Sequence, residues 1–222
     1  MSLEREYWEE LLWRNAMKIE QLHYETEFKN KGFKNIVGID EVGRGSLFGD
    51  VVACAIIMPD EKIEGVTDSK KLSEKNRNKF YELILNDCVA VGIGRVSPDI
   101  IDDINIKQAT RLAMKLAVEN LRDKNGQKVD PDLLLIDAEQ IDLDIEQYPI
   151  VHGDEYCYSI ACASIVAKVY RDKICKKWAI DYPNYGIEKH KGYGTKFHRE
   201  AIKTYGATPL HRKSFVKNIE SW

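Results

Sequence analysis

A short apolar run, "LLLID" at residues 133–137, limits the possible folds more than any other feature of this sequence. Strands with one face in water alternate polar and apolar residues, whereas this run has no polar residue before Asp137. Such continuous apolar strands are typical of parallel sheets whose two faces are both covered by helices. The run therefore predicts an α/β fold, with the Asp137 carboxylate at the carboxyl end of a buried strand.

Hydrophobic periodicity predicts the other elements of this sheet and its helical layers. Strands are expected at residues 35–40, 50–59 and 88–96, and a glycine-rich connection makes the first two a hairpin. Helices are expected at residues 4–30, 67–84, 105–121 and 159–178. Ser73 and Asn105 have the residue types of helix caps, and the last helix begins with small residues that allow close packing. This order of elements favours a mixed sheet covered by helices.

The composition argues against membrane-spanning and secreted proteins. The 222 residues are 44% hydrophobic and 31% charged, and no apolar run approaches the roughly 18 residues of a membrane span. The first residues, "MSLEREYWEELL", are acidic and lack the apolar segment of a signal peptide. Five cysteines without a CxxC spacing favour free thiols over a disulfide framework or a zinc site. We therefore expect a cytoplasmic protein without a membrane segment.

The net charge of −3 hides a basic segment near the carboxyl terminus. Residues 168–217 contain 13 Lys and Arg against 4 Asp and Glu, so the rest of the chain is strongly acidic. The segment also contains aromatic and histidine side chains: Tyr182, Tyr185, His190, Tyr193, Phe197, His198, Tyr205 and His211. Basic side chains interleaved with aromatic ones favour a nucleic-acid partner, although a solvated surface can have the same composition.

Carboxylates stand at the ends of predicted strands and before the last predicted helix. They are Asp40 and Glu41 after the first strand, Asp137 after the apolar strand, and Asp154 in "HGDE". Ligand sites in open α/β sheets gather at the carboxyl ends of strands. If the strands that carry Asp40 and Asp137 are neighbours, their carboxylates converge there. Like charges at such distances repel unless a cation or a proton lies between them.

A hard divalent cation would suit these carboxylates. Oxygen ligands without organised His or Cys favour Mg²⁺ or Mn²⁺ over zinc, and two ions about 4 Å apart would clamp the attacking and leaving oxygens of a phosphodiester. Each acid taken alone is more often a turn residue or a helix cap, so only the group favours a metal site. Adjacent strand residues point to opposite faces, so we expect a bend near Gly43 to bring Asp40 and Glu41 together.

The turn Gly43-Arg44-Gly45 would let backbone amides approach a ligand closely. A GxG sequence alone is common in turns, and this one lacks the lysine–hydroxyl ending of a P-loop. Taken with further motifs, however, the chain resembles bacterial type 2 ribonuclease H (ribonuclease HII) over residues 33–217. The motifs are, in order, "GIDEVGRG", "DSKKLSEKNR", "INIKQATRLAMKLAV", "LLLIDAEQI", "GDEYCYSIACASIVAKVYRD", "HKGYGTKFH" and "PLHRKSF".

The resemblance implies a ribonuclease H-like fold, in which a mixed five-stranded sheet is flanked by helices and followed by a helical, basic carboxyl-terminal extension. It divides the chain into an N-terminal helical extension at 1–34, a catalytic core at 35–180 and a substrate-binding extension at 181–222. The last part is expected to form one compact unit with the core. We expect a monomer, and the sequence does not decide whether a replication clamp is a partner.

The family's activity is metal-dependent endonuclease cleavage of the RNA strand of RNA–DNA hybrids, and cutting 5′ to single ribonucleotides in duplex DNA. The products have 3′-hydroxyl and 5′-phosphate ends. By resemblance, the catalytic acids and ligands of Mn²⁺ or Mg²⁺ are Asp40, Glu41, Asp137 and Asp154. The Gly43-Arg44-Gly45 turn would sense the ribose 2′-hydroxyl. Tyr193 would pack on the sugar at the ribo–deoxyribo junction, the alternative being a buried core tyrosine.

Phosphate contacts are expected from basic residues of the matching motifs, although a solvated surface role is at least as common for such lysines. The candidates are Lys70, Lys71, Lys191, Lys196, His211 and Arg212. The chain departs from the family pattern nearby: Ser46 and Asp50 replace usual prolines, Ala138 a common glycine and Glu155 a small residue. These departures concern turn rigidity and metal preference rather than the reaction.

Three other interpretations remain open at this point. The sister type, ribonuclease HIII, has the same chemistry but weak activity at single ribonucleotides, and "EVGRG" argues against it. A transposase- or resolvase-like nuclease would use the same acids on DNA alone and would have no need of the GRG turn. A non-catalytic module that binds hybrids would have no need of the intact acids, which are costly to bury.

Overall fold

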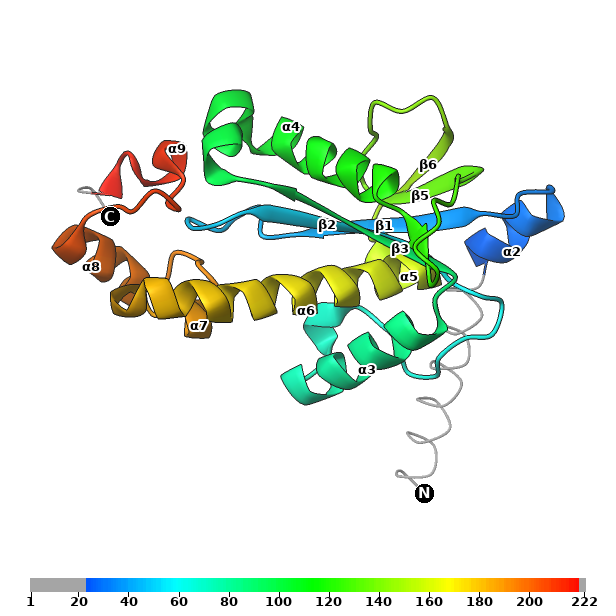
Figure 1. The fold of residues 1–222 in the computed structure, drawn as a ribbon, viewed down its shortest axis with the longest axis horizontal. Coiled ribbons are helices and arrows are strands. Elements are labelled where there is room, and N and C mark those ends of the chain that lie inside the picture. Colours follow the sequence, from blue (N-terminus) through cyan, green and yellow to red (C-terminus); the bar gives the residue numbers. More distant parts are fainter. Residues whose placement is uncertain (1–22, 220–222) are drawn as a thin grey trace, which may run out of the picture.

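The computed structural model describes residues 23–219, which form a six-stranded sheet with helices on both faces (Figure 1). The strands are β1 (Ile36–Val42), β2 (Val51–Ile57), β3 (Ala90–Val96), β4 (Arg122–Asp123), β5 (Leu133–Asp137) and β6 (Glu146–Ile150). The helices are α2 (His23–Asn30), α3 (Glu74–Asp87), α4 (Pro98–Glu119), α5 (Gly153–Tyr156), α6 (Tyr158–Asp181), α7 (Ile187–His190), α8 (Lys196–Tyr205) and α9 (Lys213–Val216), with short 3₁₀ turns η1 (Ser69–Lys71) and η2 (Pro183–Tyr185). The expected α/β class is confirmed.

The sheet is mixed, with the order β4-β3-β2-β1-β5-β6. Strands β1 to β4 pair in antiparallel fashion, which confirms the predicted hairpin of β1 and β2, whereas β5 and β6 run parallel to β1. Strand β5 lies between two parallel neighbours, and its first four residues are fully buried. The apolar run is therefore covered on both faces, as its composition predicts.

The sheet has six strands, so the expected number of five is wrong. Strand β4 is only two residues long, which is too short to leave a hydrophobic period in the sequence. Strand β6 reads "EQYPI" and is largely exposed, because it forms one edge of the sheet. Proline is tolerated at such an edge, where one side of the backbone has no ladder partner to satisfy.

The two longest helices cover the two faces of the sheet, α4 on one and α6 on the other (Figure 1). Glycines set how closely they approach. A side chain on Gly38 of β1 would overlap the backbone of Ser159 in α6, and one on Gly94 of β3 would overlap the backbone of Ala113 in α4. The small residues at the start of α6 therefore allow close packing, as predicted.

The predicted helix caps are present in the structure. The Ser73 hydroxyl accepts a hydrogen bond from the Asn76 backbone N–H at 3.2 Å and begins α3. The Asn105 side chain accepts from the backbone N–H of Lys107 at 3.0 Å, but Asn105 has a φ of +66° and marks a kink inside α4. The helix begins earlier than expected, at Pro98, because proline suits the first helical position.

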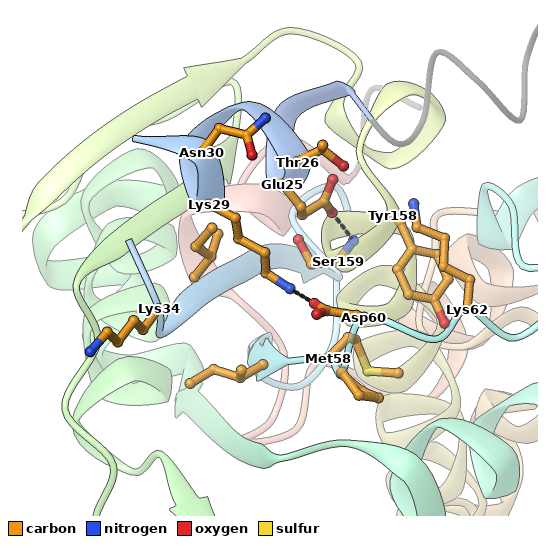
Figure 2. Close-up of a pocket in the computed structure, with 13 residues that line it drawn as sticks. Glu25, Thr26, Lys29, Asn30, Lys34, Met58, Asp60, Lys62, Tyr158 and Ser159 are labelled. Carbon is orange, nitrogen blue, oxygen red and sulfur yellow. Dashed lines mark hydrogen bonds and ion pairs between the residues drawn. The ribbon is translucent and has the colours of Figure 1, made fainter. Parts of the chain in front are cut away.

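Helix α2 packs at the end of the sheet where β1 begins and β2 ends, far along β1 from the predicted carboxylates. Figure 2 shows the Glu25 side chain pointing to the start of α6, where its Oε1 accepts from the Ser159 backbone N–H at 2.8 Å. A carboxylate there satisfies one of the free N–H groups of the first turn and complements the helix dipole. Of the helix predicted at residues 4–30, the part at 23–30 is confirmed, and residues 4–22 lie outside the described residues.

The carboxyl-terminal segment folds back onto the connection between β1 and β2. Leu47 and Phe48 of that connection are buried in one cluster with Tyr185, Ile202 and Val216. Helices α7 to α9 consequently lie together at one end of the molecule in Figure 1. Within residues 23–219, no helix has the length and apolar character needed to cross a membrane.

Candidate active site

The parallel register of β1 and β5 brings two acids level at the ends of these strands. The ladder pairs Ile39 with Ile136, so Asp40 and Asp137 follow in step. One carboxylate oxygen from each of Asp40, Glu41 and Asp137 lies within 4.8 Å of the other two. The convergence predicted for neighbouring strands is therefore present, and Glu41 joins it.

Glu41 reaches this cluster without the bend that strand periodicity led us to expect. Strand β1 stays paired with β2 through Val42, and the chain turns only at Gly43, which has a φ of +90°. The ladder between β1 and β5 ends at Ile39, so this part of the sheet is open on the β5 side. The long Glu41 side chain can therefore reach the opening from a regular strand.

The three carboxylates are in an environment that disfavours their charge. Burial raises the pKa of Asp40 well above its usual value, and the charges of Glu41 and Asp137 raise it further. Burial also raises the pKa of Glu41, although the Arg44 guanidinium opposes the shift. Burial likewise raises the pKa of Asp137. The cluster thus holds negative charge that the surrounding protein does not fully compensate.

One oxygen of the cluster indicates that these carboxylates suit a metal cation. Glu41 Oε2 is buried and accepts no hydrogen bond from any residue of the described chain, whereas Glu41 Oε1 lies 3.5 Å from Arg44 Nη1. A buried oxygen without a donor costs about 1–3 kcal/mol. Mg²⁺ and Mn²⁺ bind converging carboxylate oxygens, and the unpaired Glu41 oxygen offers one such ligand. Asp40, Glu41 and Asp137 could therefore hold such an ion together.

Asp154 lies beside the cluster rather than within it. It is buried in α5, and its Oδ2 is 3.1 Å from Lys70 Nζ. The preceding residue, Gly153, donates its backbone N–H to Asp137 Oδ1 at 2.8 Å, which ties α5 to the end of β5. Of the four predicted acids, three therefore share one oxygen cluster, and the fourth is adjacent and paired with a lysine.

A pocket of about 250 Å³ connects the carboxylates with the glycine turn. Its lining includes all three residues of Gly43-Arg44-Gly45 together with Tyr193. A Cβ on Gly45 would lie 3.8 Å from Tyr193 Cε1, so the ring is in contact range of the turn. Tyr193 is 38% exposed, which argues against the alternative of a buried core tyrosine.

The lysines expected to contact phosphate lie at different distances from this pocket. Lys70 lines it. Lys71 and Lys196 pair with nearby acids, at 2.8 and 3.8 Å respectively, and both are at least half exposed. Lys191 donates to the backbone carbonyl of Glu188 in α7. The structure therefore brings Lys70 to the acids and leaves the other three on the surrounding surface.

His211 and Arg212 are buried, so the expectation that their side chains contact phosphate does not hold in this structure. Arg212 Nη1 donates to the Arg44 carbonyl at 2.7 Å, and its Nε and Nη2 donate to the Gly49 carbonyl at 3.0 and 2.8 Å. His211 Nε2 lies 3.2 Å from Nε2 of His198, which is also buried. Basic residues usually lie at the surface, but here the carbonyls of a tight turn provide buried acceptors.

Several polar residues of the site have no counterpart among the predictions. Ser164 of α6 hydrogen-bonds Asp40, and this contact lowers the pKa of that carboxyl against the larger effect of burial. Lys168, one turn further along α6, also lines the pocket. Glu139 lies 3.8 Å from Arg44 and adds a second acid beside that guanidinium. The four-residue spacing of Ser164 and Lys168 is the sequence signal that could have found them.

The four departures from the family pattern all have a structural account. The Ser46 hydroxyl donates to the Phe48 carbonyl at 2.8 Å within the turn. Asp50 Oδ2 accepts two hydrogen bonds from Arg95, at 2.9 and 2.7 Å. Ala138 has a φ of +50°, the left-handed region that glycine adopts without strain, and Glu155 pairs with a lysine of η1.

Comparison with known proteins identifies the family. The ribonuclease HII family model matches residues 37–218. Ribonuclease HII of Alkaliphilus oremlandii is 56% identical over 196 residues, which cover 88% of this chain and 97% of that protein. Ribonuclease HII of Bacillus subtilis is 52% identical over 194 residues, which cover 87% of this chain and 74% of that protein.

Solved structures agree on the fold. Ribonuclease H2 from Pyrococcus horikoshii superposes with a TM-score of 0.69 at 23% identity and covers 85% of this chain and 98% of its own. The Bst-RNase HIII complex with Mn²⁺ gives 0.59 at 16% identity, with 84% and 69% covered. Identities this low show the fold alone, so the family model and the close relatives decide against the sister type. This chain belongs to the ribonuclease HII family and is a nuclease of the ribonuclease H type.

Proposed function

We propose that this enzyme hydrolyses the RNA strand of RNA–DNA hybrids and also cuts duplex DNA on the 5′ side of a single embedded ribonucleotide. The products would carry 3′-hydroxyl and 5′-phosphate ends. The observation that carries the proposal is a single pocket lined both by the carboxylates and by the Gly43-Arg44-Gly45 turn. A nuclease for DNA alone would need the carboxylates but not a turn that can approach a sugar.

The carboxylates would provide the cation site. Asp40, Glu41 and Asp137, with Asp154 beside them, would hold Mg²⁺ or Mn²⁺. When bound, the ions would supply activation of the attacking water and neutralisation of the leaving oxygen. The protein's contribution is to fix converging oxygens on two neighbouring strand ends before the substrate arrives, which is electrostatic preorganisation. Bst-RNase HIII, which has the same fold, has been solved in complex with Mn²⁺, and this supports a divalent cation as the cofactor.

The glycine turn and Tyr193 would select ribose. The 2′-hydroxyl both donates and accepts hydrogen bonds, so backbone groups of the turn can recognise it if they approach closely. Glycine at positions 43 and 45 removes the side chains that would keep the backbone away. The Tyr193 ring, partly exposed beside Gly45, would pack against the sugar at the ribo–deoxyribo junction.

Lysines around the pocket would position the duplex. Lys70 and Lys196 have side chains that are 80% and 86% exposed, so their ammonium groups would exchange Asp154 and Glu200 for phosphates when a duplex binds. Lys71 and Lys191 would extend the same contact surface. Such contacts fix the register of a duplex without reading its sequence. We assign no phosphate contact to His211 and Arg212, which would act from below the turn.

The setting proposed for the enzyme is the cytoplasm, as a monomer. All five cysteines are free and buried in the structure, which supports a reducing compartment. The proposed partners are RNA–DNA hybrids and duplex DNA that contains ribonucleotides.

The test is cleavage of a labelled DNA duplex with one central ribonucleotide and of a labelled RNA–DNA hybrid, in Mg²⁺ and separately in Mn²⁺. We expect a single cut 5′ to the ribonucleotide, none in the all-DNA duplex, and none with Asp137→Asn. The matched control is Asp142→Asn, which removes a fully exposed carboxylate outside the site and should cut like the wild type.

Other outcomes would change the proposal in defined ways. Cleavage restricted to longer RNA runs would contradict the proposed activity at single ribonucleotides. Cleavage of the all-DNA duplex would contradict the proposed role of the glycine turn in selecting ribose. No cleavage of any substrate, with binding intact, would contradict the proposed reaction.

A further inference from the structure

A buried cation from α6 lies directly beneath the site. Arg171 is 0% exposed, and within residues 23–219 the hydrogen bonds of its guanidinium include none to a carboxylate. Its nitrogens instead donate to uncharged groups. Nε donates to the Asp50 carbonyl at 3.1 Å, and Nη2 donates to the Phe48 carbonyl and to the Ser46 hydroxyl, both at 3.0 Å. These three acceptors all belong to the connection between β1 and β2.

Another hydrogen bond of Arg171 reaches a second segment, while Nη1 also lies 3.7 Å from Cys175 Sγ of its own helix. Nη1 donates to the Lys191 carbonyl at 2.8 Å, two residues before Tyr193. The guanidinium carbon also lies 6.0 Å from the centroid of the Tyr193 ring. One side chain therefore joins the backbone that follows the glycine turn to the loop that carries Tyr193, although these segments are far apart in the sequence.

The contact between the two segments leaves no free space. A Cβ on Gly43 would overlap the Arg171 guanidinium, and a Cβ on Gly192 would lie 2.6 Å from the Ser46 hydroxyl oxygen. Ser46 itself bridges the segments, because its hydroxyl accepts from Arg171 and lies 3.3 Å from the Lys191 carbonyl. Such packing transmits a shift of one segment to the other.

We infer that Arg171 is a positioning residue that sets the distance between the glycine turn and Tyr193, and thereby the selection of a single ribose. The inference rests on the proposed function, in which these two elements recognise the sugar. Arg171 does not itself line the pocket, so it acts through the backbone of both segments. An RNA–DNA hybrid offers ribose in many registers, whereas a single ribonucleotide offers one. Misplacement of the glycine turn or of Tyr193 should therefore slow cleavage at a single ribonucleotide more than cleavage of a hybrid.

The arrangement requires the fork of a guanidinium rather than a positive charge alone. The acceptors of Arg171 lie in different directions around one plane, which matches the five fixed donors of arginine. Lysine carries its three N–H donors on one nitrogen and cannot reproduce the bonds that Nε, Nη1 and Nη2 make from three corners of the guanidinium. Arg171→Lys therefore preserves the charge and breaks up the bridge.

The test measures kcat and KM of Arg171→Lys on the single-ribonucleotide duplex and on the hybrid. We expect kcat on the single-ribonucleotide duplex to fall about tenfold further than kcat on the hybrid, because small misplacements of reacting groups have large effects on rate. The Mn²⁺-induced rise in melting temperature should remain, since the carboxylates are unchanged. The matched control is Met114→Ala, which opens a cavity under α4 on the other face of the sheet and should lower both activities equally.

Equal losses on the two substrates with Arg171→Lys, or no loss, would overturn the inference while the proposed function stands. If the wild type cuts neither substrate, the proposed function is contradicted, and the inference that rests on it is contradicted as well. Should Arg171→Lys not fold, Ser46→Ala decides, since it removes one bridging hydroxyl and keeps the buried charge. It should show the same substrate bias at about threefold, and an equal effect on both substrates would overturn the inference.

Discussion

Two groups of buried charge lie on either side of the same turn, and their hydrogen bonding is opposite in kind. The carboxylates of Asp40, Glu41 and Asp137 crowd like charges together and leave one buried oxygen without a donor. The guanidiniums of Arg171 and Arg212 are fully buried, whereas Glu41 and Asp137 are only partly buried, yet the arginine N–H groups donate to backbone carbonyls and a hydroxyl. The more deeply buried charges are therefore the better compensated ones.

This difference in hydrogen bonding indicates that the carboxylates serve catalysis and that the two arginines serve folding. A buried charge whose hydrogen bonds are all made stabilises one arrangement of the backbone around it. A buried charge that lacks partners raises the free energy of the folded protein until a ligand supplies them. Substitutions at the two groups should consequently have opposite effects on stability, and only the carboxylates should be indispensable for the reaction.

The largest expected effect is on activity, at the carboxylates. Asp40→Asn keeps the shape of the side chain but removes a charged oxygen from the cluster, so hydrolysis of an RNA–DNA hybrid should fall by at least about 10³-fold. Single-turnover rates in saturating Mn²⁺ measure the loss. More than a tenth of the wild-type rate would show that Asp40 does not belong to the reacting group.

The next largest effect is on stability, at the arginines. Arg212→Met should lower the free energy of unfolding by about 3 kcal/mol, because it leaves the buried Gly49 carbonyl and the partly buried Arg44 carbonyl without these donors. Urea denaturation at neutral pH measures the change. A loss below about 1 kcal/mol would mean that water or a rearranged turn replaces these bonds, and the comparison between the two groups would fail.

A smaller effect involves the histidines that support the turn. Burial lowers the pKa of His198 and of His211 to about 4, below the unfolded value of about 6.5. Between pH 6.5 and pH 4 the unfolded chain binds more protons than the folded chain. The contribution of the two neutral histidines to the free energy of unfolding is therefore present above pH 6.5 and is lost as the pH falls to 4. We expect a loss of about 2.5 kcal/mol for each histidine over this interval.

Urea denaturation of the wild type and of His211→Asn at several pH values isolates this effect. The variant has one protonation fewer and should lose about 2.5 kcal/mol less than the wild type between pH 6.5 and 4. Identical pH dependence of the two proteins would contradict the neutral, buried state of His211.

The smallest effect concerns the strained residue beside Asp137. Ala138 has a φ of +50°, which disfavours a side chain, so Ala138→Gly should stabilise the protein by about 0.5 kcal/mol with little change in the cleavage rate. Thermal unfolding measures the gain. Destabilisation would show that the alanine methyl group contributes packing that outweighs the backbone strain.

The carboxylates could be predicted from the sequence because two independent patterns locate them. The apolar run predicts a buried parallel strand, and acids at strand ends converge when the strands are neighbours. The chain does turn at Gly43, but only after both acids, so the expectation that this bend brings Asp40 and Glu41 together was wrong. Strand periodicity takes no account of the reach of the Glu41 side chain toward the part of β1 that no longer pairs with β5. The edge strands β4 and β6 were missed because they are short or polar.

The arginines could not be predicted, because the residue type alone indicates the surface. Their burial depends on backbone carbonyls of the turn at residues 44–50 and of Lys191, which meet only in the folded chain. The same argument explains His211, which was expected at a phosphate and lies in the layer below. Part of the basic character of the carboxyl-terminal segment is therefore internal rather than a contact surface.

The central claim, that the carboxylates are destabilising until a cation binds, is tested most directly by the melting temperatures of the wild type and Asp40→Asn with and without Mn²⁺. Without the ion, the variant should melt at least about 2 °C higher, because it has less buried like charge. With the ion, the wild type should gain stability and the variant should gain much less. A variant that melts lower without Mn²⁺, or an equal gain in both proteins, would contradict the claim.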